Sequence, residues 1–331
     1  MTPPRPDLSI SLVSLNRADL VHQCLTALEK NTDSISYEVH LVAHEYDPVA
    51  LGDIVARHPG IVVHRVSGTR GYSQNNNVAL RAARGRFVAI LNDDTVVCGD
   101  LFGTLVRFLD GHPDVAGVCP VLRNPDGSLQ MGVRGRFTPL SFAAGELRLD
   151  RLLPRRWAVH LGAFDRPWLP PETSRAVDTE AGTGACFVAR REALEAIGLL
   201  DESYFLGPDD IDWSVRLRNQ VGRVVLLPSA NLIHFGSATL GRSYHAVLPA
   251  VYAGCYTFFR RHHGRLAEWF VRIALGFGWS GFLAVAWGVI ARVQSSQHAS
   301  TMWRARWNCV RFAFSRDPSP RVFSKTMTDR S

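Results

Sequence analysis

The stretch FVAILNDDT (residues 87–95) places a run of apolar side chains directly before two adjacent carboxylates. The run Phe87–Leu91 is typical of a buried strand, and it ends abruptly at Asn92, Asp93 and Asp94. Neighbouring carboxylates at the end of a buried strand are costly unless a positive charge or water reaches them. Because Asn and Asp also favour turns, the stretch indicates either a plain turn or a cation site.

Short apolar segments alternate with amphipathic segments through the first part of the chain. Strands and helices that alternate at this spacing predict a parallel α/β sheet. The expected strands are Leu8–Leu15, Tyr37–Ala43, Gly60–Val66 and Arg86–Leu91, and the expected helices are Asp19–Lys30, Asp47–His58 and Asn75–Arg84. Ligands of such sheets bind at the carboxyl ends of strands. The residues after Leu91 and the loop at 67–73 are therefore candidate site elements.

The second part of the chain begins with a segment of weak periodicity. Leu122–Val177 is rich in Arg, Pro and Gly, and we expect a long, partly irregular excursion there. Order returns with an expected strand at Thr183–Arg190, a helix at Arg191–Ile197, a helix within 207–222, and strands at Arg223–Pro228 and Asn231–Ser237. Pro208 favours a helix start, and three carboxylates follow it in the first helical turn. The helix dipole alone would favour negative charge at that position.

Taken together, these segments resemble glycosyltransferase family 2, the inverting nucleotide-sugar transferases of GT-A fold. The matching pieces are Asn16-Arg17 after the first strand, RGYSQNNNVAL (70–80), LNDDT (91–95), the block 182–218, and NLIHFGS (231–237). The likeness covers about residues 8–240. It implies a Rossmann-like, mostly parallel sheet flanked by helices. It also implies transfer of a hexose-type sugar from a nucleotide-diphosphate donor to a hydroxyl of a glycan or lipid-linked acceptor.

The resemblance assigns roles on the donor side. The metal motif of the family is D-x-D, here filled by Asn92-Asp93-Asp94, and it implies Mg²⁺ or Mn²⁺. Side chains alternate along an extended segment, so Asn92 and Asp94 should face the same way. We expect Asp94 as the main metal ligand, with Asn92 and His234 beside it. Asp93 is expected to contact the ribose or to stay solvated. The other expected donor-binding residues are Asn16, Gly71, Asn75 and Asn77.

The resemblance also names a general base for the acceptor hydroxyl. This residue is Asp210 of PDDID (208–212), placed to give inversion in one displacement. Asp212 is expected to cap or brace the helix. The other residues expected on the acceptor side are Asp209, Gly182, Thr183 and Gly184. The stretch DGS-Q (126–130) is similar to the branch that includes rhamnosyltransferases of cell-surface polysaccharides.

The sequence departs from the family after the second strand. Members usually carry an acidic residue there that contacts the nucleotide base, whereas this chain has Ala43. His44, Glu45 and Asp47 are the candidates to replace it. The nucleotide and sugar of the donor therefore stay open, as do the acceptor, the linkage and the oligomeric state.

The tail, from about residue 246, is basic, aromatic and apolar. Ile273–Ala291 has no charged side chain, and a helix of about 19 residues spans roughly 28 Å, close to the thickness of a bilayer core. Both flanks are basic, which opposes a single span and favours a re-entrant or interfacial helix. A buried helix of the core is the alternative. The net charge of +7 suits anionic partners, which are nucleotide phosphates, anionic lipid or nucleic acid, and does not choose among them.

We expect a GT-A catalytic domain over residues 1–245, with its donor half up to about 120 and its acceptor half from about 121. A membrane-associated helical segment would follow over 246–331. Scattered single cysteines and an N-terminus without a signal-peptide hydrophobic region favour the cytoplasmic face of the membrane, with peripheral or monotopic attachment. No nucleic-acid partner is expected. The alternatives are a nucleotidyltransferase, which the second acidic cluster disfavours, and a non-catalytic nucleotide- or lipid-binding relative.

Overall fold

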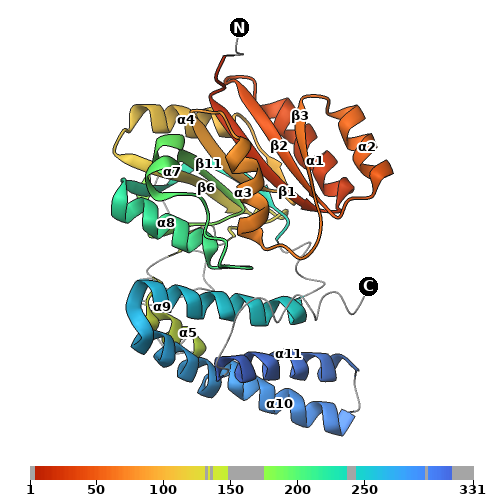
Figure 1. Cartoon of the computed structure of the whole chain (residues 1–331), viewed down its shortest axis with the longest axis vertical. Coiled ribbons are helices and arrows are strands. Elements are labelled where there is room, and N and C mark those ends of the chain that lie inside the picture. Colours follow the sequence, from red (N-terminus) through yellow and green to blue (C-terminus); the bar gives the residue numbers. More distant parts are fainter. Residues whose placement is uncertain are drawn as a thin grey trace. The chain divides into compact units, whose positions relative to one another are not determined.

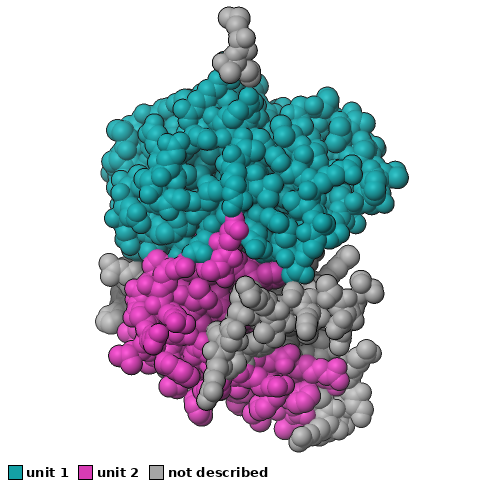
Figure 2. Space-filling view, in the orientation of Figure 1, with its two compact units in different colours: residues 1–134, 167–201, 210–239 teal, residues 135–166, 202–209, 240–331 magenta. Residues whose placement is uncertain are grey.

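The computed structural model describes residues 4–130, 133–134, 137–147, 175–236, 244–294 and 297–314. The chain groups into two compact units, which Figure 2 shows in teal and magenta. Unit 1 comprises residues 1–134, 167–201 and 210–239, and unit 2 comprises residues 135–166, 202–209 and 240–331. Each unit is therefore assembled from several stretches of sequence.

Unit 1 is built on a mixed, mostly parallel sheet. Its described strands lie in the order β3-β2-β1-β4-β10-β6-β11-β5, with β8 beside β11. The bounds are β1 Leu8–Leu15, β2 Tyr37–His44, β3 Ile61–Val66, β4 Phe87–Asn92, β5 Thr95–Val97, β6 Val115–Arg123, β8 Val177–Asp178, β10 Cys186–Arg190 and β11 Arg223–His234. Strands β1 to β4 are parallel, and β10 runs antiparallel to both β4 and β6. A separate pair joins β7 (Val133–Arg134) and β9 (Ala181–Gly182). The expected α/β fold class is confirmed.

Helices cover both faces of this sheet (Figure 1). Along β4, Phe87, Ala89 and Leu91 belong to one buried cluster while Val88 and Ile90 belong to the other, as alternation along a strand requires. The first cluster packs against α1 (Ala18–Asn31), α2 (Pro48–Arg57) and α4 (Leu101–Gly111), and the second against α3 (Tyr72–Ala82), α7 (Arg191–Ile197) and α8 (Asp209–Gln220). Burial on both faces explains the continuous apolar run in the sequence.

Most expected elements are present, and four differ. Helix α3 begins at Tyr72 rather than Asn75, because the Gly71 N–H is satisfied by the Gln74 side chain at 2.9 Å. The two expected strands after residue 222 are one strand, β11, whose register against β6 shifts between Leu227 and Asn231. Pro228 lies in this shift and cannot donate to a ladder.

The expected irregular middle segment also contains a helix. This helix, α5 (Pro139–Glu146), starts behind Thr138, whose hydroxyl accepts a hydrogen bond from the Ser141 N–H at 3.1 Å. Residues 148–174 of the same segment lie outside the described residues.

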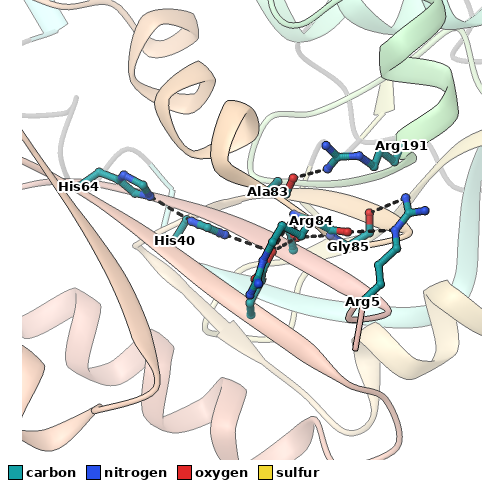
Figure 3. Close-up of polar contacts among 9 residues, drawn as sticks. Arg5, His40, His64, Ala83, Arg84, Gly85 and Arg191 are labelled. Atoms are coloured by element: carbon teal, nitrogen blue, oxygen red, sulfur yellow. Dashed lines mark hydrogen bonds and ion pairs between the residues drawn. The ribbon is translucent and has the colours of Figure 1, made fainter. Parts of the chain in front are cut away.

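A polar network joins the amino-terminal ends of β1 and β2 to the end of α3. The Glu38 carboxylate accepts hydrogen bonds from the Ser9 hydroxyl at 2.6 Å and from the Arg84 backbone and guanidinium, both at 2.8 Å. His40 Nε2 lies 3.3 Å from Glu38, and Figure 3 shows the hydrogen bond between His40 Nδ1 and His64 Nε2, which are 3.0 Å apart. Burial raises the pKa of Glu38, but the bonds from Ser9 and Arg84 outweigh it and bring the pKa to about 2. Glu38 is therefore ionised in the folded protein at neutral pH.

Unit 2 is helical in its described part. It contains α5, α9 (Tyr244–Phe277), α10 (Trp279–Gln294) and α11 (Gln297–Ala313), and α10 and α11 lie side by side (Figure 1). Phe137 packs on Phe258 and Phe259, with ring centroids 4.9 and 4.6 Å apart. Helix α9 is interrupted at Gly264, whose φ of 86° suits glycine.

The expected continuous helix over Ile273–Ala291 is divided in the structure. Helix α9 ends at Phe277 and α10 begins at Trp279. A side chain on the intervening Gly278 would meet the Ala274 and Glu146 carbonyl oxygens at 2.4 and 2.9 Å, so the close approach requires glycine. Among the described residues, no helix combines the length and apolarity needed to cross a bilayer.

Candidate active site

The carboxyl end of β4 forms a tight turn that carries both carboxylates. The Thr95 hydroxyl donates to the Asn92 carbonyl at 2.7 Å and closes this turn before β5. The plain-turn interpretation is therefore correct for the backbone. Yet Asp93 and Asp94 are only 6% and 5% exposed. A turn does not require buried carboxylates, so their burial points to a further role.

Asp93 occupies an unfavourable environment for a charge. Burial raises its pKa to about 6 and the Asp94 charge adds to the rise, while a hydrogen bond from Ser14 and the charge of Arg17 oppose it. The Oδ2 atom of Asp93 is buried and has no hydrogen-bond partner in the described part of the chain. The expectation that Asp93 stays solvated does not fit this burial, and the ribose contact stays a prediction.

His234 lies beside Asp94 at the end of β11. Strand β11 pairs with β5 so that His234 is opposite Thr95. The His234 Nε2 is 3.1 Å from Asp94 Oδ1 and 3.5 Å from the Asn92 amide nitrogen. The three expected metal ligands therefore come together from two distant parts of the sequence.

Gln130 fixes which nitrogen of His234 carries a proton. The Gln130 amide donates to Asn124 Oδ1 at 2.9 Å, so its oxygen faces His234 Nδ1 at 2.6 Å. His234 Nδ1 must then be the donor, so a ring that carries a single proton turns its Nε2 lone pair toward Asp94. Two acceptors facing each other at 3.1 Å require a positive charge between them, either a proton or a metal ion.

These residues fit a cation that is shared with a substrate. No three His, Cys, Asp or Glu side chains converge on one point within the described ranges. The protein set is one carboxylate, one imidazole and one amide, from Asp94, His234 and Asn92. Mg²⁺ is commonly held by one or two carboxylates together with substrate phosphates rather than by a full protein cage.

A short segment before β10 connects this corner to Asp210. The Asn92 N–H donates to the Ala185 carbonyl at 3.0 Å, and the next residue back, Gly184, donates its N–H to Asp210 Oδ2 at 3.0 Å. The Tyr72 hydroxyl donates to the Gly184 carbonyl at 2.7 Å. A side chain at Gly184 would come within 2.7 Å of that hydroxyl, so this approach requires glycine. The structure thus brings Asn92 and Asp210 to one corner of unit 1.

The three carboxylates at the start of α8 have different surroundings. Asp210 is half-buried, and its Oδ1 accepts from the Ile211 N–H at 2.8 Å. Asp212 is fully buried and pairs with Arg216 at 2.8 Å. The Arg216 guanidinium also donates to the backbone carbonyls of Ile197, at the end of α7, and of Leu199. This confirms the bracing role expected for Asp212. Asp209 is buried.

Two of the other acceptor-side residues make contacts within unit 1. Gly182 is buried, and a side chain there would come within 2.4 Å of the Phe187 ring. Thr183 is half-buried, and its hydroxyl accepts from the Ala185 N–H at 3.3 Å. Their acceptor-side role stays a prediction, as does that of Asp209.

The expected donor-binding residues make contacts within the protein. Asn75 bonds to His44 Nδ1 at 3.1 Å and accepts from the Arg70 guanidinium at 3.0 Å. Asn77, 1% exposed, bonds through both amide atoms to the Leu200 backbone. These are contacts of a loop scaffold, and the donor-binding role of both asparagines stays a prediction.

Gly71 ends the loop before α3, and Asn16 starts the loop after β1. Gly71 is buried and caps α3. Asn16 is exposed, has a φ of 52°, and accepts a hydrogen bond from the Asp47 N–H at 3.2 Å. Their donor-binding role also stays a prediction.

The candidates to replace the missing acidic residue after β2 are all engaged locally. Ala43 is buried. His44 Nε2 lies 2.7 Å from the Gly68 carbonyl, and Glu45 accepts from the Gly68 N–H at 2.6 Å. Asp47 caps α2 by accepting from two backbone N–H groups. None of these contacts identifies the nucleotide base.

The chain is similar in sequence to two named bacterial proteins. The chain is 26% identical over 257 residues to the O-antigen biosynthesis protein RfbC of Myxococcus xanthus, covering 77% of this chain and 19% of that protein. It is 28% identical over 165 residues to the N-acetylglucosaminyl-diphospho-decaprenol L-rhamnosyltransferase of Mycobacterium tuberculosis, covering 49% of this chain and 52% of that protein. The chain thus spans about half or less of the length of these relatives.

A solved structure shares the fold. The mannosyltransferase PcManGT of Pyrobaculum calidifontis, solved with GDP-Man and Mn²⁺, superposes with a TM-score of 0.52 at 16% identity, covering 99% of this chain and 89% of that one. This likeness confirms the expected GT-A fold. The family model for glycosyltransferase-like family 2 matches residues 4–253. The chain belongs to this family.

Proposed function

We propose that the protein is a metal-dependent, inverting glycosyltransferase that moves a sugar from a nucleotide-diphosphate donor to a hydroxyl group. The observation that supports this most is the corner of unit 1 where Asn92, Asp94 and His234 meet. It is joined to the Asp210 carboxylate through Gly184 and Ala185. One half of this corner suits a cation and a diphosphate, and the other half suits a proton acceptor.

The transfer reaction needs a cation site and a general base, and different residues supply them. Asp94, His234 and Asn92 would hold Mg²⁺ or Mn²⁺, which supplies positive charge for the leaving diphosphate. Asp210 takes the proton of the acceptor hydroxyl. Hydrogen bonds from the Gly184 and Ile211 N–H groups hold its carboxylate in position for this role. A base on the side of the sugar away from the diphosphate gives inversion in one displacement.

The relatives support a role in surface polysaccharide synthesis. One carries the name of an O-antigen biosynthesis protein, and another is named as a rhamnosyltransferase whose acceptor is a polyprenyl-linked sugar. We propose a lipid-linked or glycan acceptor, with rhamnose as the first sugar to test. Such an acceptor would place the protein at the cytoplasmic face of a membrane, attached peripherally or monotopically.

Replacement of the proposed base tests the reaction. We expect Asp210→Asn to bind the donor nucleotide nearly as the wild type does and to lose transfer, by about 100-fold or more. A thermal-shift screen of nucleotide sugars with and without Mn²⁺ identifies the donor and measures its binding by the variant. Normal turnover by Asp210→Asn would show that the base is assigned wrongly.

The same screen addresses the non-catalytic alternative. A binding-only relative would be stabilised by a nucleotide sugar but would not hydrolyse or transfer it in the presence of Mn²⁺. Absence of any nucleotide-dependent shift, with or without Mn²⁺, would contradict the proposed function as a whole.

A further inference from the structure

Helix α9 carries an exposed apolar face beyond its interruption at Gly264. Leu266, Trp269, Phe270, Ile273 and Phe277 recur at helical spacing, so they lie on one side of the helix. All five are exposed, Leu266 to 88% and Phe277 to 80%. We call these five residues the apolar stripe. A contiguous exposed stripe of this kind indicates an interaction surface, whereas single exposed apolar residues do not.

The next helix repeats the pattern. On α10, Phe282, Val285 and Val289 are exposed at helical spacing, while Ala284 is buried. On α9 the opposite side is buried through Val271. Both helices therefore pack one side into unit 2 and leave an apolar side in contact with solvent.

The charged residues of helices α9 to α11 are almost all of one sign. Between residues 244 and 314 the only acidic residue in the sequence is Glu268. Its side chain is 10% exposed and pairs with Arg272 at 2.6 Å, so it adds little negative charge to the surface. Exposed arginines surround the stripe in the sequence, at Arg260, Arg265 and Arg304. A partner of this surface must therefore accept apolar side chains and carry negative charge.

We propose that the apolar stripe docks into the interface of an anionic lipid bilayer, with α9 lying in the plane of the membrane. Interfacial helices combine an apolar face with basic residues that meet phosphate headgroups, and tryptophan favours the headgroup level, where Trp269 would lie. A second copy of the chain is disfavoured because it would place arginines against arginines. The inference rests on the proposed function only in that a lipid-linked acceptor requires a membrane.

Vesicle binding by the full chain tests the stripe. We expect co-sedimentation with vesicles of phosphatidylcholine and phosphatidylglycerol, and at least about tenfold weaker binding by the double variant Leu266→Gln/Phe277→Gln. Both side chains are exposed, so neither replacement leaves a cavity. The matched control is Val49→Gln on α2, 81% exposed in unit 1, which should bind as the wild type does. Equal binding by the double variant and the control would overturn the proposal.

Removing single positive charges gives a second, independent test of vesicle binding. Arg265→Gln should weaken binding about fivefold, whereas Lys30→Gln at the exposed end of α1 should not. Binding that is equal for neutral and anionic vesicles would overturn the role of anionic lipid. A dimer in solution that the double variant dissociates, with no vesicle binding by the wild type, would assign the stripe to self-association instead.

Nucleotide binding separates this proposal from the proposed function. The stripe variants should keep the thermal shift that a nucleotide sugar gives with Mn²⁺. A wild type that shows this shift but fails to bind anionic vesicles overturns the membrane surface alone. If the wild type binds vesicles but shows no thermal shift with any nucleotide sugar, the proposed function is wrong and the membrane-binding proposal is supported.

Discussion

Replacing Gln130 with methionine should weaken binding of the metal ion without removing any of its proposed ligands. Gln130 accepts from His234 Nδ1 at 2.6 Å, and Asn124 orients its amide. Methionine has a similar length and no comparable acceptor. Without that acceptor, His234 is free to carry its proton on Nε2. Asp94 Oδ1, 3.1 Å away, would then accept a hydrogen bond from Nε2. An incoming metal ion would then have to displace this proton.

Two independent estimates of the expected loss of Mn²⁺ affinity agree. Residues that orient a metal-bound histidine typically contribute about 10- to 100-fold to metal affinity. A buried donor left without its partner costs about 1–3 kcal/mol, and the His234 side chain is only 13% exposed. Because 1.4 kcal/mol is about tenfold, this cost corresponds to the same range. We therefore expect Mn²⁺ to bind Gln130→Met about 10- to 100-fold more weakly.

Calorimetric titration with Mn²⁺ in the presence of donor nucleotide measures this affinity directly. Gln130→Glu keeps an acceptor for His234 Nδ1 and should bind Mn²⁺ at least as well as the wild type. Gln23→Met, on the exposed side of α1, controls for the substitution itself. If Gln130→Met binds within about twofold of the wild type while His234→Ala does not, the orienting role of Gln130 is wrong. If His234→Ala also binds normally, the metal site itself is wrong.

Two further predictions concern stability. Glu38→Gln should lower the free energy of unfolding by about 3 kcal/mol at neutral pH, since the folded-state pKa of about 2 is below the ordinary 4.5. This stabilisation is complete above pH 4.5 and is lost as the pH falls toward 2, so urea unfolding at several pH values should show the two proteins converging. Asn77→Ala should cost about 2–3 kcal/mol, because the Leu200 backbone loses two buried partners. A variant that keeps its stability but loses nucleotide affinity would contradict the scaffold role and favour the predicted donor contact.

Local patterns were enough to predict the first half of the sheet. Strand β1 has the bounds Leu8–Leu15 in both sequence and structure, because it is a short apolar run with polar residues on either side. Helix α7 likewise begins and ends where its sequence indicates. The single strand β11 was not predictable from Pro228, which normally ends a strand. Pairing with β6 on both sides of the register shift continues the strand past it.

The candidate site was predictable only through residues that share a family pattern. Asp94, His234 and Asp210 lie far apart in the chain, and no spacing rule joins them. Parallel strands end at one edge of a sheet, and this rule places Asp94 at that edge. The positions of His234 and Asp210 depend on where β11 and β10 lie in the sheet, which the sequence does not show. The role of Gln130 was missed. The only signal was its place in the stretch 126–130, which says nothing of His234.

The two carboxylates that follow β4 differ in the group that lies beside them. Asp94 lies against His234, and a cation there would satisfy both groups at once. Asp93 keeps a buried oxygen without a partner in the described residues, and such a group costs about 1–3 kcal/mol until a donor reaches it. A ribose hydroxyl is a donor of the right kind, and a nearby cation would lower the cost of the Asp93 charge. Binding of the ion and of the nucleotide should favour each other, because a cation held at Asp94 would attract the negatively charged diphosphate of the donor.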